Sequence, residues 1–300
     1  MNILLATDGS EYSETAAGYL KRLSLPPETG IVVLYVLKDY LLPDDMDAAR
    51  DFKKAGKKGA EAIVGHFVSL LEPTGCRVTG AVREGEPWRE IIEGAHDAGP
   101  DLIVLGHRGV KGINRFLMGS VAQKVVRDCQ ASALVVRELP SLDRPMRVLY
   151  CTDGSESARY ALELMARIPF RKDAEVHVLA VADVEISSLP EKYYPEDDFS
   201  VMMETLRGHY RQAAEKVVSE DSARLGGYFK DVRGRVVFGV PEQEILKAAE
   251  DLQADLIVMG SKGLKGLKGA ILGSSSLRVM RHAECGILIA KAPEKKGPQL

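Results

Sequence analysis

Cysteine and long apolar stretches are scarce in this chain of 300 residues, and each of these scarcities excludes a class of protein. The four cysteines form no CxxC pair and stand beside no paired histidines, so we expect reduced thiols and no structural metal site. No apolar stretch approaches the ~20 residues of a membrane-spanning helix, so we expect no membrane association. The first residues lack the pattern of a secretory signal, and these features together predict a cytoplasmic protein.

The net charge of the chain is −3, and residues of both signs are interspersed along it. No basic patch or acidic tail stands out, so we predict that the chain does not bind nucleic acid. The run KKAGKKGAE at residues 53–61 carries four lysines, which we assign to the solvated face of a helix. A hydrophobic content of 45% is typical of a globular protein, and the length suits about two domains.

The pentapeptide TDGSE occurs twice, and the segments around it repeat in the same order. Asp153 follows Asp8 by 145 positions (153 − 8), and the apolar runs IVVLYV and VHVLAV keep that offset. Further segments are offset by 154 positions: GEPWREI and GVPEQEI, DLIVLG and DLIVMG, SALVVR and GILIAK. The register therefore changes once, through a nine-residue insertion in the second copy that we place near SSLPEKYYPEDD. These constant offsets indicate a duplicated domain.

Each copy alternates short apolar runs with segments of helical periodicity. Continuous Val/Ile/Leu runs between helices are typical of parallel strands that are buried on both faces. We therefore predict an α/β fold of two tandem five-stranded, parallel-sheet α/β sandwich domains. They should span residues 1–140 and 145–293, joined by a Pro-containing linker around residues 139–146.

Several helices can be placed from the same pattern. Long helices are expected at residues 46–72 and 199–225, and Pro87 and Pro241 stand where a proline is tolerated in a first helical turn. The YYPEDD segment of the insertion is interpreted as surface decoration, with a flap over the second cleft or a partner surface as the alternatives.

A glycine-rich loop with the pattern G-x2-G-x9-G-S follows the fourth predicted strand of both copies. The matching residues are Gly106, Gly109, Gly119 and Ser120 in the first copy, and Gly260, Gly263, Gly273 and Ser274 in the second. Glycines there would let the backbone approach a ligand and take positive φ angles. The Gly-Ser pair would open a helix, whose free N–H groups favour an anion. We expect both serines to cap that helix and to donate to a phosphate oxygen.

The charge and spacing of this loop favour phosphate binding over a plain surface loop. Basic residues surround it, at Lys111, Arg115, Lys262, Lys265 and Lys268. The alternative is a glycine-rich loop with solvated lysines, but identical spacing in two copies argues against it. The loop lacks the GK[ST] ending of a Walker A motif. His107 lies inside the first loop and is Ser261 in the second copy, so we expect a solvent-exposed histidine and no shared general base.

An aspartate closes the first predicted strand of each copy. Asp8 and Asp153 have no partner base or metal ligand beside them, so a ligand contact is favoured over catalysis. The pattern Asp-x-x-Glu also resembles a capping box, so helix capping stays open as the alternative.

With TDGS after the first strand and the complete glycine pattern, both copies resemble universal stress protein domains, and the chain resembles the tandem type with two fused domains. The resemblance spans residues 1 to about 292. It implies the adenine nucleotide alpha-hydrolase-like fold, with strand order 3-2-1-4-5 in each half. TDGS and the glycine loop would then meet at the switch point between strands one and four. The family associates through its last strand, so we expect the halves to pack as a pseudo-twofold pair, with a homodimer of whole chains left open.

The resemblance also implies a set of nucleotide-binding residues. Asp8 and Asp153 match the aspartate near the adenosine, and Val36 and Val181 match the residue whose backbone reads the adenine edge. Ribose and phosphate contacts match Gly106, Gly109, Gly119, Ser120 and Val121, and in the second half Gly260, Gly263, Gly273, Ser274 and Ser275. Ser275 departs from the family's usual valine, which adds either a phosphate donor or a helix cap.

The ligand implied by the resemblance is ATP, or ADP or AMP, with Mg²⁺ or Mn²⁺ held by the phosphates. The first functional hypothesis is a non-catalytic, nucleotide-binding protein of the stress response, whose nucleotide sets its conformation or its protein partners. Two alternatives stay open: a weak ATPase or autophosphorylating phosphotransferase in the same clefts, and an adaptor with one functional nucleotide site. We predict no catalytic residues, because the copies share no Ser/His/Asp set and no paired carboxylates.

Overall fold

The computed structural model describes residues 1–38, 47–109, 118–182, 196–264 and 272–292. The tyrosines of the YYPEDD segment lie outside these ranges, as do the predicted loop cations Lys111, Arg115, Lys265 and Lys268. The first half contains β1 (Asn2–Thr7), α1 (Glu11–Arg22), β2 (Gly30–Leu37), α2 (Asp47–Leu71), a 3₁₀ turn η1 (Glu72–Thr74), β3 (Arg77–Glu84), α3 (Pro87–Ala98), β4 (Leu102–Gly106), α4 (Ser120–Asp128) and β5 (Ser132–Val136). The second half contains β6 (Arg147–Cys151), α5 (Glu156–Arg167), β7 (Glu175–Ala182), α6 (Glu196–Leu225), β8 (Asp231–Phe238), α7 (Pro241–Leu252), β9 (Leu256–Gly260), α8 (Ser274–His282) and β10 (Gly286–Ala290).

The strands form one ten-stranded sheet in the order β3-β2-β1-β4-β5-β10-β9-β6-β7-β8. Each half therefore has the predicted order 3-2-1-4-5, and neighbouring strands within a half run parallel. The halves join where β5 pairs antiparallel with β10, with Leu134 opposite Leu288. These two strands carry SALVVR and GILIAK, the segments that were expected at the contact between the halves.

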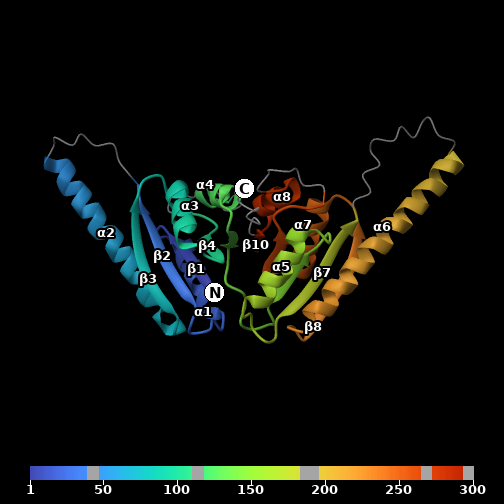
Figure 1. Cartoon of the computed structure of the whole chain (residues 1–300), viewed down its shortest axis with the longest axis horizontal. Coiled ribbons are helices and arrows are strands. Elements are labelled where there is room, and N and C mark those ends of the chain that lie inside the picture. The colour runs from blue at the N-terminus through green and yellow to red at the C-terminus, as the bar shows by residue number, and fades with distance from the viewer. Residues whose placement is uncertain (39–46, 110–117, 183–195, 265–271, 293–300) are drawn as a thin grey trace, which may run out of the picture.

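Helices cover both faces of the sheet, which gives three layers (Figure 1). Buried side chains of α1, α2, α5 and α6 pack on one face, and those of α3, α4, α7 and α8 pack on the other. Each of the two apolar clusters contains residues of both halves, so the core continues through the β5–β10 seam. Figure 1 also shows α2 and α6 on the two outer flanks, with their N-terminal ends extending past the sheet.

The helix boundaries follow from local signals that the sequence contains. Acidic residues stand in the first turn of α1 and basic residues in its last turn, which complements the helix dipole. Pro87 and Pro241 open α3 and α7, as predicted. Along the described part of α2, the lysines of KKAGKKGAE are exposed, which agrees with a solvated face.

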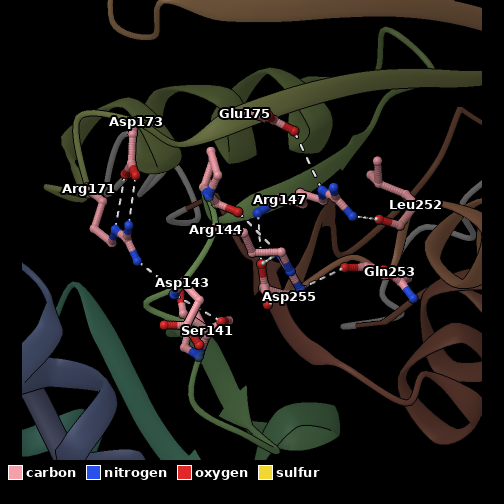
Figure 2. Close-up of polar contacts among 12 residues, drawn as sticks. Ser141, Asp143, Arg144, Arg147, Arg171, Asp173, Glu175, Leu252, Gln253 and Asp255 are labelled. Carbon is pink, nitrogen blue, oxygen red and sulfur yellow. Dashed lines mark hydrogen bonds and ion pairs between the residues drawn. The ribbon is translucent and has the colours of Figure 1, made fainter.

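A network of arginines fixes the linker between the halves to the second half (Figure 2). Arg144 donates to both carboxylate oxygens of Asp255, at 2.7 and 3.0 Å, and to the Gln253 carbonyl at 3.2 Å. Arg171 donates to the Ser141 carbonyl at 2.9 Å. Because Asp255 directly precedes β9, the linker is fastened to the start of a central strand.

The equivalent aspartate of the first half is bonded across the seam instead. Asp101 precedes β4, accepts the Asn2 N–H at 2.8 Å, and pairs with Arg167 at the end of α5 at 2.9 Å. The pseudo-twofold counterpart of Arg167 is Arg22, which donates to the linker carbonyl of Pro140. Arg144 of the linker therefore takes the position at Asp255 that pseudo-symmetry would give to Arg22.

Candidate functional site

The carboxyl ends of β1, β2 and β4 meet at one edge of the sheet. Thr7, the last residue of β1, lies opposite Tyr35 on β2, so Asp8 and Val36 follow at the same edge. The pairing of β1 with β4 brings Gly106 to that edge as well. The equivalent strands of the second half pair in the same register and bring together Asp153, Val181 and Gly260. The sequence-predicted residues that end these strands are thus neighbours in both halves.

Serine, and not aspartate, caps the helices that follow β1 and β6. The hydroxyls of Ser10 and Ser155 accept the N–H three residues further on, at 3.4 and 3.2 Å. The capping-box alternative for Asp8 and Asp153 is therefore wrong by two positions. The intervening Gly9 has a φ of +78°, and this turn separates the aspartate from the start of the helix.

The aspartate after β6 connects the strand to the glycine loop. Asp153 Oδ1 accepts the Ser155 N–H at 2.9 Å, and its Oδ2 accepts the Leu264 N–H of the loop at 2.8 Å. In the first half, Asp8 Oδ1 accepts the N–H and the hydroxyl of Ser10, at 3.1 and 2.6 Å. These bonds fix the position of each carboxylate at the carboxyl edge of its half-sheet.

The glycines of the loop are required by contacts within the protein. A Cβ on Gly106 would lie 2.6 Å from both the carbonyl carbon and the carbonyl oxygen of Tyr12 in α1, and a Cβ on Gly260 would lie 2.6 Å from the carbonyl carbon of Ser157 in α5. A Cβ on Gly263 would lie 2.8 Å from Asp153 Oδ2, and Gly109 faces Asp8 in the same way. The expectation of positive φ angles at the motif glycines is wrong, because none of them has one. Gly106 and Gly260 have no room for a Cβ because β4 and β9 end directly beneath the first turns of α1 and α5.

The helices α4 and α8 begin at glycine and have no side-chain cap. Gly119 and Gly273 are the N-cap residues, so the expectation that Ser120 and Ser274 cap these helices is wrong. The Gly119 N–H donates to the His107 carbonyl at 2.7 Å, which closes the loop at its base, and Gly273 does the same to Ser261 at 2.6 Å. Among the described residues, no side chain caps the first-turn N–H groups of α4 and α8, and such a helix start suits an anion.

The second residue of each helix has a different environment in the two halves. Val121 is partly buried against the apolar cluster, whereas Ser275 lies close to the carboxylate of Glu242 on α7. Glu242 pairs with Arg278 of α8. Burial works to raise the pKa of Glu242, but backbone, arginine and serine contacts outweigh it and lower that pKa. Ser275 does not cap the helix, because the N-cap residue is Gly273.

His107 is buried, and its side chain contacts Tyr12 of α1. Its exposed fraction is 7%, so the expectation of a solvent-exposed loop histidine is wrong. The ring lies edge-on to Tyr12 with a centroid distance of 4.7 Å. Burial, with smaller contributions from Arg137 and Arg108, lowers the pKa of His107 to about 4, so the imidazole is neutral near pH 7.

A buried carboxylate beneath the second cleft was missed by the sequence analysis. Asp221 of α6 is 4% exposed and accepts the Thr152 hydroxyl at 2.8 Å. The Tyr150 hydroxyl lies 3.1 Å from the same carboxylate oxygen and 2.9 Å from the Ala158 carbonyl. The first half has Phe67 at the position of Asp221, and that difference at a constant offset is the signal that could have located the network.

Two further basic residues were missed, Arg137 after β5 and Lys291 after β10. Both are buried, with exposed fractions of 8% and 5%. They occupy equivalent positions, 154 residues apart (291 − 137), at the ends of SALVVR and GILIAK. A basic residue kept after the same buried strand in both copies is the sequence signal that was available.

Two properties of the described residues limit the chemistry of the site. No three His, Cys, Asp or Glu side chains in the described ranges gather as metal ligands would. Within the same ranges, every helix is too short or too polar to span a bilayer. The site that the described residues do form combines backbone N–H donors, a fixed carboxylate and a strand end.

Known proteins share this architecture. A model of the universal stress protein family matches residues 1–137 and 145–291. A universal stress protein of Methanocaldococcus jannaschii is 34% identical over 151 residues, which cover 50% of this chain and 84% of that protein. The crystal structure of a universal stress protein from Archaeoglobus fulgidus has a TM-score of 0.64 and 25% identity, covering 97% of this chain and 98% of that one. A functionally unknown protein of Pseudomonas aeruginosa has a TM-score of 0.60 at 15% identity, covering 97% and 92% of the two chains, which shows the fold alone.

Proposed function

The chain belongs to the universal stress protein family, and we propose that each of its halves binds an adenine nucleotide at the carboxyl edge of its sheet. One observation carries this proposal: α4 and α8 begin at Gly119 and Gly273 without a side-chain cap, at the switch point of each half-sheet. Open α/β sheets bind ligands at that point, and an uncapped helix start favours a phosphate.

The phosphates would lie against the first turns of α4 and α8. Ser120 and Ser274 are the first helical residues, and both are exposed, so their hydroxyls can donate to a phosphate oxygen. A Mg²⁺ or Mn²⁺ ion would be held by the phosphates, since the described residues offer no carboxylate cluster for it. Such an ion would neutralise part of the phosphate charge.

The adenosine would lie over the ends of β1 and β2 in the first half and of β6 and β7 in the second. Asp153 accepts hydrogen bonds from the Ser155 and Leu264 N–H groups, and it keeps acceptor capacity because a carboxylate has about four lone-pair sites. Asp8 stands at the equivalent position of the first half. Val36 and Val181 lie beside them in the register and can present backbone groups to the adenine edge. The nucleotide would then span the cleft from strand end to helix start.

The proposed role is binding without catalysis. His107 is buried and neutral near pH 7, and the second half has Ser261 in its place, so the clefts share no general base at this position. We propose that the bound nucleotide sets the conformation or the protein partners of the chain during stress. The weak ATPase or phosphotransferase alternative predicts measurable release of ADP, which the same samples can be assayed for.

A charge placed at the helix starts tests nucleotide binding with little risk to the fold. The change is Ser120→Asp with Ser274→Asp, because an acidic residue in a first helical turn complements the dipole and stabilises the helix. The same carboxylate repels phosphate, so we expect ATP affinity to fall roughly tenfold or more. Ser120→Asn with Ser274→Asn is the matched control, which keeps the shape without the charge and should retain affinity. The measurement is isothermal titration calorimetry with ATP.

Each single variant resolves the stoichiometry. Two nucleotides per wild-type chain and one per Ser120→Asp or Ser274→Asp chain support a site in each half. One nucleotide per wild-type chain would support the adaptor with a single functional site. If the wild-type chain binds no adenine nucleotide, and none is released when freshly purified protein is denatured, the proposal is wrong.

A further inference from the structure

Three basic side chains are buried together beside the seam in the first half. They belong to His107 and Arg108, which follow β4, and to Arg137, which follows β5. Their exposed fractions are 7%, 6% and 8%. The guanidinium of Arg137 stays charged, and an arginine is rarely this buried without a paired carboxylate or another anion.

The backbone holds these residues side by side. Gly106 lies opposite Val136 in the parallel register, and the His107 N–H donates to the Val136 carbonyl at 2.9 Å. The pairing therefore continues one residue past the strands, and Arg137 emerges next to His107. The His107 carbonyl in turn accepts the N–H of Gly119, so the cluster adjoins the start of α4.

The guanidinium of Arg137 has buried donors that nothing in the described structure satisfies. Its Nε and one Nη are buried and have no hydrogen-bond partner, and the same holds for His107 Nδ1. The carboxylates of Glu284 and Glu138 work to raise the pKa of Arg137, but both residues are exposed. Neither is hydrogen-bonded to Arg137 among the described residues. Burial lowers the pKa of Arg137, with Arg108 acting in the same direction.

The equivalent cation of the second half, Lys291, is hydrogen-bonded to the protein. Lys291 Nζ crosses the seam and donates to the Val126 and Cys129 carbonyls at the C-terminal end of α4. The corresponding end of α8 accepts no hydrogen bond from Arg137. A buried cation whose donors have no acceptor is costly. Lys291 meets this requirement with two carbonyl oxygens, whereas Arg137 has buried donors that no described residue accepts.

We propose that Arg137 and His107, flanked by Arg108, form a separate oxyanion site at the seam of the first half, which takes a phosphoryl group. The guanidinium fork matches the geometry of phosphate oxygens, and the neutral imidazole can add a neutral N–H donor. The second half has no equivalent site, because Lys291 is already bonded. The phosphoryl group comes either from free orthophosphate or from the distal end of a nucleotide in the first cleft.

The first experiment uses orthophosphate and no nucleotide, so its outcome does not depend on the proposed nucleotide binding. Phosphate is titrated into the full chain and followed by calorimetry and by the melting temperature. We expect one phosphate per wild-type chain and at least tenfold weaker binding by Arg137→Gln. Lys230→Gln removes one exposed positive charge and serves as the control, with affinity unchanged. In phosphate-free buffer, Arg137→Gln should melt at or above the wild-type temperature, because it removes an unbonded buried charge.

A second experiment identifies the source of the phosphoryl group. ATP and AMP are titrated into wild type and Arg137→Gln. If Arg137→Gln binds ATP more weakly than wild type but binds AMP equally well, the site takes the distal phosphates of the nucleotide. If the variant binds both nucleotides as wild type does and the first experiment is positive, the site takes free orthophosphate. If Arg137→Gln does not fold, Arg137→Lys keeps the charge, loses the fork, and should bind phosphate with intermediate affinity. Equal affinities of wild type and the Arg137 variant for phosphate, ATP and AMP would overturn the proposal.

Discussion

The first glycine of the loop motif should be a packing requirement that is felt without any ligand. Gly106→Ala would place a Cβ 2.6 Å from two backbone atoms of Tyr12, where ordinary contacts begin near 3.4 Å. Both sides of this contact are backbone, so the end of β4 and the first turn of α1 must move apart. Overpacking of this kind costs about 1–3 kcal/mol, and we expect the upper end because no side chain can rotate away.

The same substitution elsewhere in this half provides a control of opposite sign. Gly59 lies in α2 with nothing within 4 Å of an added Cβ. Alanine is favoured over glycine in a helix interior by about 0.5–1 kcal/mol, so Gly59→Ala should stabilise the chain. Two identical chemical changes should therefore differ by about 3–4 kcal/mol in the free energy of unfolding.

Urea and thermal unfolding followed by far-ultraviolet circular dichroism measure this difference. A change of 1 kcal/mol corresponds to about 2–4 °C for a unit of this size, so Gly106→Ala should melt about 6–12 °C below wild type. The measurement is made without nucleotide, and Gly260→Ala should repeat the result in the second half. A Gly106→Ala chain as stable as wild type would refute the steric reasoning and leave ligand approach as the role of this glycine.

Two more predictions concern ionisable groups. His107 has a pKa of about 4 in the folded chain, below its ordinary 6.5. As the pH falls, the unfolded chain therefore binds the proton first. The stability of the fold is full above about pH 6.5 and falls toward pH 4. Between pH 7 and 5 wild type should lose about 1–2 kcal/mol more than His107→Ser, and an equal fall of the urea midpoint in the two chains would contradict this. Arg144→Ala should lower the free energy of unfolding by about 1–3 kcal/mol, because Asp255, 9% exposed, loses a bidentate partner. Arg127→Ala removes an exposed pair with its neighbour Asp128 and should cost under about 0.5 kcal/mol. Similar losses in the two variants would show that burial of the carboxylate does not matter.

Much of the fold follows from the periodicity and the repeat. The strands and the limits of the long helices could be predicted, because buried parallel strands leave continuous apolar runs. The strand order and the seam between SALVVR and GILIAK were expected from the resemblance to universal stress proteins. The structure places the long helices at Asp47–Leu71 and Glu196–Leu225, within three residues of the predicted limits. The position of the glycine loop relative to TDGS followed from that implied strand order, since it places strands one and four side by side.

The chemistry of individual loop residues could not be predicted, because it depends on what a second segment brings to them. The choice of Ser10 over Asp8 as the helix cap depends on a turn at Gly9. The burial of His107 depends on Tyr12, which lies far from it in the sequence and above it in the fold. Local composition predicts an exposed histidine in a glycine-rich loop, and the tertiary contact overrides that expectation.

The duplication shows how a structural role can persist while its chemistry changes. Trp88 of α3 holds Lys124 of α4 by a cation–π contact with the ammonium 4.9 Å from the ring centroid. At the equivalent positions, Glu242 of α7 holds Arg278 of α8 by an ion pair. Both contacts fasten the helix whose uncapped start faces the glycine loop. The offset between the copies therefore predicts which positions hold this helix in place. The residue types alone do not predict it, because neither a tryptophan nor a glutamate would be assigned that role without its counterpart in the other copy.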